Sequence, residues 1–307
     1  MAGNVICLHK DIRTSGKLRF KCHDCGKWYN PKNVPDERYR TSTREAPKNQ
    51  PKILVLDLET LPLLAYIWDV WNQNISMTMM DRDTKSKAIV TWSAKWLNDS
   101  KMMSDKMTVK EALKQDDRRI VESLWKLVDE ADWLIAHNGI KYDIPVFNTR
   151  CLIHGISSPS PYKVIDTLMV ARRQFALPHN KLEYIAQVLD IPVKMETGGF
   201  SLWRGCMLGD QKSLYHMQKY NDKDVLILEE VYLRLRGWIK NHPNFNLYTD
   251  KEGCCPTCGA EDTLKPNGKY RTTVNTYQSY KCSIKECSSF SRTGKSDNKT
   301  DIRSVAK

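Results

Sequence analysis

The chain of 307 residues contains no apolar run near the ~18 residues that a transmembrane helix needs, and no apolar stretch follows Met1. Both absences favour a soluble intracellular protein, and we expect it in the cytoplasm of a bacterial or phage-infected cell, with no membrane partner. Hydrophobic residues make up 41% of the chain, which is more than disordered proteins carry. The length predicts roughly one to three folded domains.

Cysteine is scarce in the middle of the chain. Of the ten cysteines, only Cys151 and Cys206 lie between residues 26 and 253, and we interpret these two as buried, unreactive thiols. The other eight fall near the two ends. Clustered cysteine pairs in a chain without a secretion signal favour zinc sites over disulfides.

The middle of the chain also carries almost no net charge. Residues 53–240 carry 25 Lys/Arg and 24 Asp/Glu, whereas residues 1–52 carry 12 and 5 and residues 241–307 carry 11 and 7. The net charge of +12 therefore sits mainly at the two ends. A polyanion that contacts the ends is the natural partner. Basic tails that only aid solubility are the alternative.

Residues 1–33 carry the first cysteine cluster. Cys22 and Cys25 form a C-x2-C pair followed by glycine, the turn that tetrahedral zinc sites favour. We predict a Zn²⁺ site with the ligands Cys7, His9, Cys22 and Cys25. The Cys-x-His spacing is tighter than usual, so His23, or no fourth protein ligand, is the alternative to His9. The segment resembles the small zinc ribbons at the start of transposases and many phage proteins, which implies binding to nucleic acid.

Residues 34–52 are rich in Pro, Lys, Arg and Thr, and we predict a linker there. Residues 241–292 carry the second predicted zinc ribbon, with the ligands Cys255, Cys258, Cys282 and Cys287. Cys254 competes with Cys255, and the sequence leaves both as candidates. Between the two pairs, basic and aromatic residues alternate on a predicted hairpin. We expect residues 293–307 to be a disordered basic tail.

Residues 53–240 carry a pattern of strands followed by alternating strands and helices. We predict strands at 53–58, 61–68, 88–96 and 133–136, helices at 117–130, 143–155, 166–176, 181–189 and 211–239, and a loop at 70–87. This order predicts an α/β domain with one mixed β-sheet flanked by helices.

Two carboxylates stand at the end of the first predicted strand. Side chains alternate between the faces of a strand, so Asp57 and Glu59 project to the same side. Two buried carboxylates on one face repel each other and lose solvation. A divalent cation such as Mg²⁺, which prefers carboxylate oxygens, removes that cost. A pair that points into water is the alternative.

Two more acidic positions fit the same hypothesis. Asp143 stands at the start of a predicted helix, where helix capping is the alternative role. Tyr220 and Asp224 are four residues apart in the last predicted helix and so share one face. Asp224 lies beside apolar residues and needs a partner. A salt bridge to Lys181 or Arg172 is the alternative to a metal.

The three acidic segments resemble the motifs of a known family. Asp57-Leu-Glu59, then Asn138-Gly-Ile-Lys-Tyr-Asp143, then Tyr220-x3-Asp224 are similar in order and separation to the motifs of DEDD 3′–5′ exonucleases. The Tyr-x3-Asp form of the third motif is that of the DEDDy branch, which includes proofreading domains of DNA polymerases. The resemblance covers residues 53–240. It looks closest to stand-alone phage and bacterial exonucleases related to the family-B polymerase proofreading domain.

The resemblance implies a ribonuclease H-like fold and two metal ions, Mg²⁺ or Mn²⁺, besides the two structural Zn²⁺. The implied metal ligands are Asp57, Glu59, Asp143 and Asp224. Tyr220 is implied to orient the attacking water. Asn138, Lys141 and Trp203 are candidate substrate contacts. Trp203, in a predicted glycine-rich loop, is a candidate for stacking on the terminal base. The alternative for Lys141 is a solvated side chain, and the alternative for Trp203 is an aromatic ring packed in the core.

These features predict a metal-dependent 3′–5′ exonuclease that hydrolyses nucleic acid, with DNA favoured over RNA and a single strand or a 3′ end as substrate. A replication or recombination protein is a further expected partner. The alternatives are a structure-selective endonuclease or a ribonuclease H on the same fold. A zinc-ribbon binding protein with a vestigial nuclease core is the alternative outside enzymes.

Overall fold

The structure, a computed structural model, describes residues 50–69, 71, 74–80, 86–193, 198–249 and 253–302, together with the backbone of three short N-terminal strands. These strands are β1 (Ile12–Thr14), β2 (Phe20–Cys22) and β3 (Trp28–Tyr29), which form an antiparallel sheet in a separate compact unit. The predicted zinc ligands Cys7, His9 and Cys25 lie outside the described residues, as does the side chain of Cys22.

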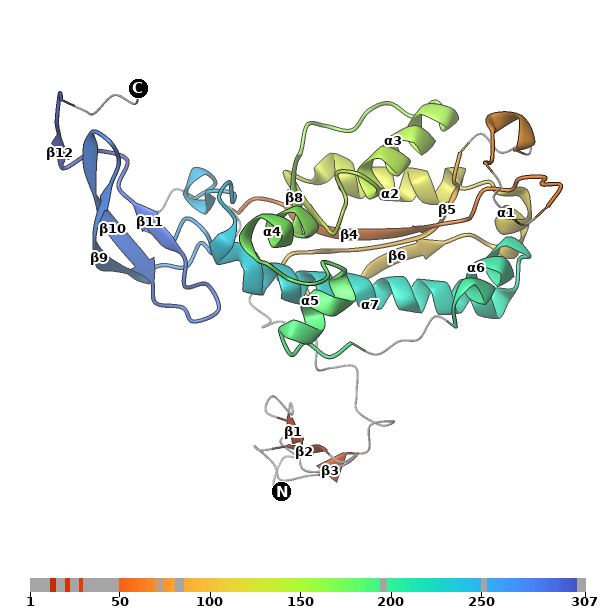
Figure 1. Cartoon of the computed structure of the whole chain (residues 1–307), viewed down its shortest axis with the longest axis horizontal. Helices are drawn as coiled ribbons and strands as arrows, with labels where there is room; N and C mark the ends of the chain where they lie inside the picture. Colours follow the sequence, from red (N-terminus) through yellow and green to blue (C-terminus); the bar gives the residue numbers. More distant parts are fainter. Residues whose placement is uncertain are drawn as a thin grey trace, which may run out of the picture. The chain divides into compact units, whose positions relative to one another are not determined.

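A five-stranded mixed sheet organises residues 53–166 (Figure 1). Its strands are β4 (Ile53–Thr60), β5 (Ile89–Trp96), β6 (Met103–Lys106), β7 (Trp133–Ala136) and β8 (Lys163–Asp166). The order across the sheet is β6-β5-β4-β7-β8. β5 is antiparallel to both β4 and β6, whereas β4, β7 and β8 run parallel. The predicted mixed sheet is confirmed.

Helices cover both faces of this sheet. They are α1 (Val109–Lys114), α2 (Arg118–Glu130), α3 (Asp143–His154), α4 (Thr167–Gln174), α5 (Leu182–Val188), α6 (Phe200–Met207) and α7 (Gln211–Leu235). Figure 1 shows α2 and α3 on one side of the sheet and α7 along the other. Among the described residues, no helix is both long and apolar enough to cross a bilayer.

The apolar alternation of β4 explains why helices pack on both of its faces. Leu54 and Leu56 share a buried cluster with Leu124 of α2. Ile53 and Val55 point the other way and share a second cluster with residues of α7. Because successive side chains of a strand alternate, Asp57 and Glu59 continue the face of β4 that meets α7. The central strand therefore carries its acidic pair toward the longest helix.

The predicted strand at 61–68 is wrong. The sheet pairing of β4 ends at Thr60, and the next pairing is a single bridge between Ala65 and Met80. Pro62 has no N–H to donate to a neighbouring strand. Trp68 is almost fully exposed, so this apolar run is not a buried strand. The short 3₁₀ helix η3 (Met77–Met79) lies within the segment predicted as a loop.

Four elements of the core were not predicted. β6 and β8 are short and carry charged residues, so they lack the apolar pattern of β4. α1 has only one buried residue, Ala112, although Thr108 and Glu111 form a capping box at its start. α6 occupies the segment predicted as a glycine-rich loop around Trp203, and this prediction is corrected. Gly198 and Gly199 precede the helix and Gly205 lies within it, and Leu202 and Cys206 bury one face of it.

The C-terminal ribbon consists of β9 (Leu264–Arg271), β10 (Asn275–Cys282), β11 (Phe290–Arg292) and β12 (Asn298–Lys299). β9 and β10 form the predicted hairpin, and β11 and β12 also pair with β10. The predicted disorder of the tail is therefore wrong at β12, which pairs with Asn275 and Thr276. Two 3₁₀ helices, η4 (Arg236–Trp238) and η5 (Phe245–Leu247), link α7 to the ribbon.

Candidate active site

Strand β4 and helix α7 hold the acidic cluster between them. From Tyr232 to Asn221 the helix advances about 16 Å, and from Ile53 to Asp57 the strand advances about 13 Å. Ile53 shares a buried cluster with Tyr232 at one end of this contact. At the other end, the side chain of Asn221 on α7 reaches Asp57. The two elements therefore run side by side in opposite directions.

Three of the four predicted metal-binding carboxylates come together. Asp57, Glu59 and Asp224 each place an oxygen within 4.8 Å of the others. The first two come from β4 and the third from α7. Within the described residues, Asp224 forms no ion pair with Lys181 or Arg172, so the salt-bridge alternative is wrong. The three side chains form a convergent set of oxygen ligands of the kind that Mg²⁺ and Mn²⁺ bind.

Burial and mutual repulsion make this cluster hard to ionise. Burial, with the charges of Asp143, Asp224 and Glu59, raises the pKa of Asp57 well above its ordinary value. Burial, followed by the charges of Asp224 and Asp143, raises the pKa of Glu59 to about 8. Burial raises the pKa of Asp224 to about 6. At neutral pH such a group of carboxylates requires either protons or a cation, so the donor set fits a divalent metal.

Asp143, the fourth predicted acid, lies beside the cluster. It is the first residue of α3 and only 3% exposed. Its Oδ1 accepts the backbone N–H of Leu58 at 3.3 Å, so it contacts the strand between Asp57 and Glu59. Burial raises its pKa to about 7. It does not cap α3, whose N-cap is Tyr142, so the capping alternative is wrong.

Tyr220 contacts the cluster through its hydroxyl. The hydroxyl donates a hydrogen bond to Asp224 one helical turn away and thereby lowers the pKa of that carboxyl. Burial, followed by the charges of Asp224 and Glu59, raises the pKa of Tyr220 above its ordinary value. The phenol is therefore neutral at physiological pH. It can donate or accept a hydrogen bond but is not poised to act as a base.

Two neutral side chains orient the acids of β4, and neither contact was predicted. The Asn221 amide donates to Asp57 Oδ2 at 2.5 Å, and the asparagine is fully buried. The Trp203 indole donates a hydrogen bond to Glu59, which lowers the pKa of that carboxyl against the effect of burial. The half-buried ring of Trp203 packs against the core, as the alternative to base stacking predicted. The only sequence signal for Asn221 is its place beside Tyr220 on the face of Asp224.

The loop between β7 and α3 is held by a carboxylate that the sequence did not single out. Asp166, at the end of β8, accepts the backbone N–H groups of Asn138 at 3.0 Å and Ile140 at 3.2 Å. The same side chain caps α4 by accepting the N–H of Leu168 at 3.0 Å. Asn138 has a left-handed backbone with φ of 68°. The candidate substrate contact Lys141 lies in this loop and is exposed.

Two further features of this loop bring it close to β7 and β4. Gly139 approaches β7 so closely that a Cβ atom there would lie 2.3 Å from the Cβ of Ala136. The hydroxyl of Tyr142 forms a hydrogen bond of 2.7 Å with Thr60 Oγ1, directly after the Asp57–Glu59 pair. The first and second predicted motifs are therefore joined by side-chain contacts at the carboxyl ends of parallel strands, where α/β sheets commonly bind ligands.

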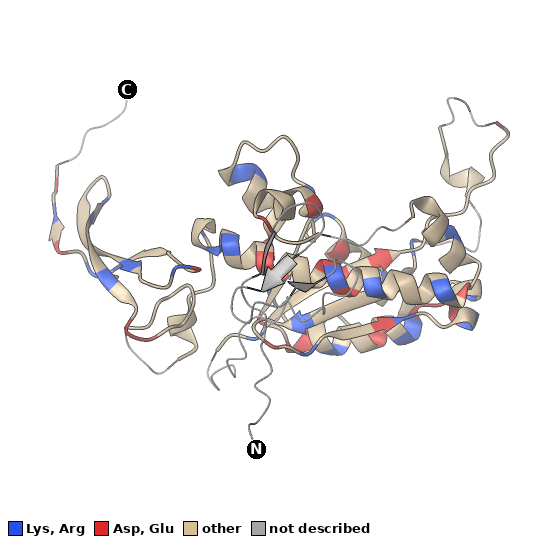
Figure 2. Cartoon of the chain, turned by 90° about the horizontal axis from the view of Figure 1, so that it is seen from below, with Lys and Arg blue, Asp and Glu red and all other residues tan. Residues whose placement is uncertain are grey.

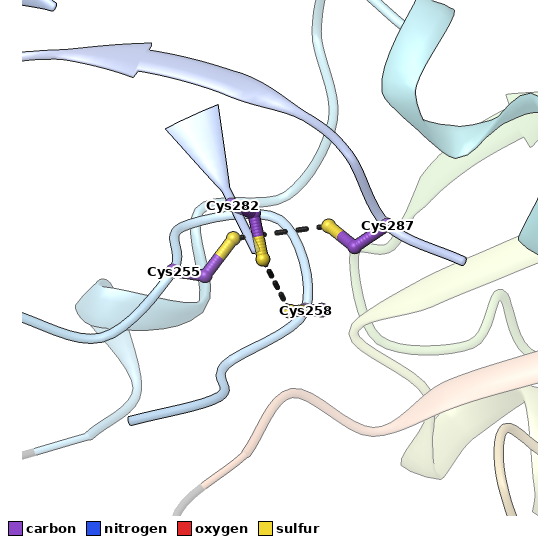
Figure 3. Close-up of side chains that lie close together, drawn as sticks. All are labelled: Cys255, Cys258, Cys282 and Cys287. Carbon is purple, nitrogen blue, oxygen red and sulfur yellow. Dashed lines mark hydrogen bonds between the residues drawn. The ribbon is translucent and has the colours of Figure 1, made fainter. Parts of the chain in front are cut away.

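A second ligand cluster lies in the C-terminal ribbon, where four cysteine side chains converge (Figure 3). The Sγ atoms of Cys255 and Cys287 are 3.8 Å apart, and those of Cys258 and Cys282 are 3.9 Å apart. Four sulfurs bound tetrahedrally at about 2.3 Å from Zn²⁺ lie about 3.8 Å from one another, so the cluster fits zinc. Cys254 is outside it, which resolves the competition in favour of Cys255.

Comparisons with known proteins match the central part of the chain. A sequence model of the RNase_H superfamily matches residues 81–236, just over half of the chain. The matched range includes Asp143, Tyr220 and Asp224 and begins after Asp57 and Glu59. The PolC-type DNA polymerase III of Ureaplasma parvum serovar 3 is 28% identical over 119 residues, which are 38% of this chain and 8% of that polymerase. The chain thus spans only a small part of that relative.

Among solved structures, the family B DNA polymerase of the hyperthermophilic archaeon Pyrobaculum calidifontis aligns with 64% of this chain and 27% of its own chain. The alignment has 13% sequence identity and a TM-score of 0.41.

Proposed function

Because the chain belongs to the RNase H superfamily and holds a partly buried cluster of carboxylates at the end of its central strand, we propose that it is a metal-dependent 3′–5′ exonuclease. Its substrate is nucleic acid, with DNA favoured over RNA. The observation that carries the proposal is the convergence of Asp57, Glu59 and Asp224 with the hydroxyl of Tyr220. The similarity of the three motifs to those of DEDDy exonucleases supports the 3′–5′ direction.

The proposed ligands of two Mg²⁺ or Mn²⁺ ions are Asp57, Glu59, Asp224 and Asp143. Bound divalent cations would stabilise charge on the attacking and leaving oxygens of a phosphodiester. The chain itself supplies the fixed geometry. Asn221 holds one oxygen of Asp57, and the indole of Trp203 holds Glu59. Such supporting hydrogen bonds keep metal-binding carboxylates in one orientation.

Tyr220 has a positioning role in this proposal. Its phenol is neutral and already donates to Asp224, so its oxygen is available to accept a hydrogen bond from a water molecule. A water held in this way beside the acidic cluster is oriented toward a phosphate without being deprotonated by the tyrosine. Asn138 and Lys141 are proposed to contact the substrate from the neighbouring loop, where the lysine is exposed.

The zinc proposal has two parts. The four cysteines of the C-terminal ribbon are proposed to bind one structural Zn²⁺. A second Zn²⁺ in the N-terminal segment, held by Cys7, His9, Cys22 and Cys25, is a proposal from the sequence alone. A replication or recombination protein is proposed as a partner because the PolC-type relative is a DNA polymerase.

The experiment incubates the full-length protein with 3′-labelled and 5′-labelled DNA and RNA strands, in Mg²⁺, in Mn²⁺ and without divalent metal. Release of mononucleotides from the 3′ end, dependent on metal, is the expected result. Internal cuts, or cleavage of RNA only within a hybrid, would instead indicate an endonuclease or a ribonuclease H. Binding without any cleavage would indicate the vestigial-core alternative.

Three variants sharpen the same assay. Asp224→Ala is expected to abolish hydrolysis, since the cluster loses one of its three convergent ligands. Tyr220→Phe removes only the hydroxyl and should lower turnover by roughly 10- to 1000-fold with little change in affinity. Tyr215→Phe is the matched control, because Tyr215 is exposed on the same helix. Wild-type turnover in Tyr220→Phe would remove the water-positioning role.

A further inference from the structure

One face of the C-terminal ribbon gathers aromatic and basic side chains. In β10, Tyr277, Ser279 and Lys281 point to the same side because side chains alternate along a strand. Residues directly opposite in antiparallel strands share that side. The pairing adds Tyr270 and Lys265 from β9 and Arg292 and Phe290 from β11. We call this set the aromatic face: Lys265, Tyr270, Tyr277, Lys281, Phe290 and Arg292.

The side chains of the aromatic face contact one another as cation–π pairs. The guanidinium of Arg292 lies 3.9 Å from the ring centre of Tyr277 and 5.5 Å from that of Tyr270. The two tyrosine rings are 6.3 Å apart and inclined by 50°. The ammonium of Lys281 lies 5.4 Å from the ring centre of Phe290. These contacts hold the aromatic rings, the planar guanidinium of Arg292 and the ammonium of Lys281 in fixed positions on the sheet.

Two rings of this face are open to solvent, whereas Tyr277, which lies beneath the guanidinium of Arg292, is only 9% exposed. Phe290 is 62% exposed and Tyr270 is 50% exposed, although both are large and apolar enough to gain from burial. Residues 264–292 carry six Lys/Arg and one Asp/Glu. Figure 2 shows basic residues in blue on the strands of the ribbon. The surface therefore combines open rings with positive charge.

The opposite side of the same sheet differs in that its lysine is paired with a carboxylate of the chain. Lys269 pairs with Gln278 of β10, and its ammonium is bound by Gln278 at 2.9 Å and by Asp297 at 2.6 Å. Its charge is therefore matched by a carboxylate of the chain. Tyr280 lies on this side as well, because it alternates with Lys281. The two sides provide a comparison within one small module.

We propose that the aromatic face binds single-stranded nucleic acid, with bases stacked on Tyr270 and Phe290 and phosphates near Lys281 and Arg292. Unpaired bases offer π-faces to aromatic rings, whereas the bases of a duplex stack on each other. An acidic protein would match the charge but not the open rings. The inference rests on the proposed function, because a nuclease that acts at a 3′ end gains from a second contact along the same strand.

The test measures binding of a fluorescently labelled oligothymidylate with phosphorothioate linkages to the full-length protein, without added divalent metal, so that hydrolysis does not interfere. Phe290→Ala and Tyr270→Ala should each raise Kd by about 5- to 100-fold, the range expected for losing one stacked base. Tyr280→Ala, on the opposite side, is the control and should change Kd less than about 2-fold. Zinc content and thermal unfolding check that each variant is folded.

Salt dependence separates the charged contacts. Lys281→Gln should reduce the slope of log K against log salt by about 0.7, the value for one phosphate contact on a single strand. Lys269→Gln should leave the slope unchanged. Unchanged Kd in both aromatic variants, or an equal loss of affinity for a blunt duplex of the same length, would overturn the proposal.

The active site is read out separately by hydrolysis of thymidine 5′-(4-nitrophenyl phosphate), a small phosphodiester that cannot span two sites. Variants of the aromatic face should hydrolyse it at the wild-type rate. Binding that depends on the aromatic face, without hydrolysis of any substrate, would contradict the proposed exonuclease while retaining this inference. Hydrolysis by a protein whose binding is unaffected by the Phe290 and Tyr270 substitutions would support the proposed exonuclease and contradict this inference.

Discussion

Replacing Glu59 by glutamine should make the metal-free protein more stable while removing its activity. Burial and the charges of Asp224 and Asp143 raise the pKa of Glu59 from 4.5 to about 8. Between these two values the folded chain keeps a proton that the unfolded chain releases. Folding therefore takes up protons, and the free energy of unfolding falls as the pH rises from 4.5 toward 8. Glutamine has no such proton to keep.

The size of the effect follows from the same pKa. Each pH unit above 4.5 costs the folded chain about 1.36 kcal/mol, so the cost is about 1 kcal/mol at pH 5 and about 3 kcal/mol at pH 7. Glu59→Gln should recover these amounts, because the amide oxygen of glutamine can still accept the indole N–H of Trp203. At about 2–4 °C per kcal/mol, the Tm should rise by about 6–12 °C at pH 7.

The assay is thermal unfolding of the full-length wild type and variant in metal-depleted buffer at pH 5 and pH 7. Added Mn²⁺ should raise the Tm of the wild type more than that of the variant, because a ligand stabilises the state that binds it. Glu122→Gln, an exposed residue of α2 paired with Arg118, is the control and should shift Tm little at either pH. An equal gain at both pH values, or a lower Tm for Glu59→Gln at pH 7, would refute the assignment of Glu59 to a partly buried cluster of mutually repelling carboxylates.

Two further predictions concern Trp203, which supports the acidic cluster, and Cys258, which is a member of the cysteine cluster. Trp203→Phe keeps an aromatic ring but removes the hydrogen bond to Glu59, so the Mn²⁺ concentration for half-maximal hydrolysis should rise by about 10- to 100-fold; an unchanged metal titration would reduce Trp203 to a packing role. Cys258→Ser should lower the zinc content of the purified protein by one ion per chain, because a tetrahedral site loses one of its four thiolates, and metal analysis showing full zinc in this variant would contradict the ligand set.

The elements that the sequence predicts well are those whose burial is encoded locally. β7 follows from four consecutive apolar residues, and the long α7 follows from its periodicity together with the polar Asp210 at its start. β6 and β8 belong to the sheet because neighbouring strands offer hydrogen bonds, and their own residues are half polar. The run from Leu63 to Trp68 shows the opposite failure, since most of its apolar residues are exposed.

The candidate site divides in the same way. The acids were predictable because carboxylates beside apolar residues need partners, and that need can be recognised in the sequence. The hydrogen bonds of Trp203 and Asn221 depend on how α6 and α7 pack near β4, which no local pattern records. Asp166 was predictable only in part. Its place at the start of a predicted helix suggests a cap, but its hydrogen bond from the backbone N–H of Asn138 depends on the pairing of β7 with β8.

The position of the acidic cluster on β4 has a consequence for local unfolding. β4 lies between β5 and β7 and is covered by α7, so we expect its amide hydrogens to be among the last to exchange with solvent. Sites built on surface loops open by small fluctuations, whereas the backbones that carry Asp57 and Asp224 belong to the central strand and to α7. Exchange of the amide hydrogens of β4 should therefore require the same opening event as global unfolding. Loss of the ligand cluster on heating should coincide with loss of the fold.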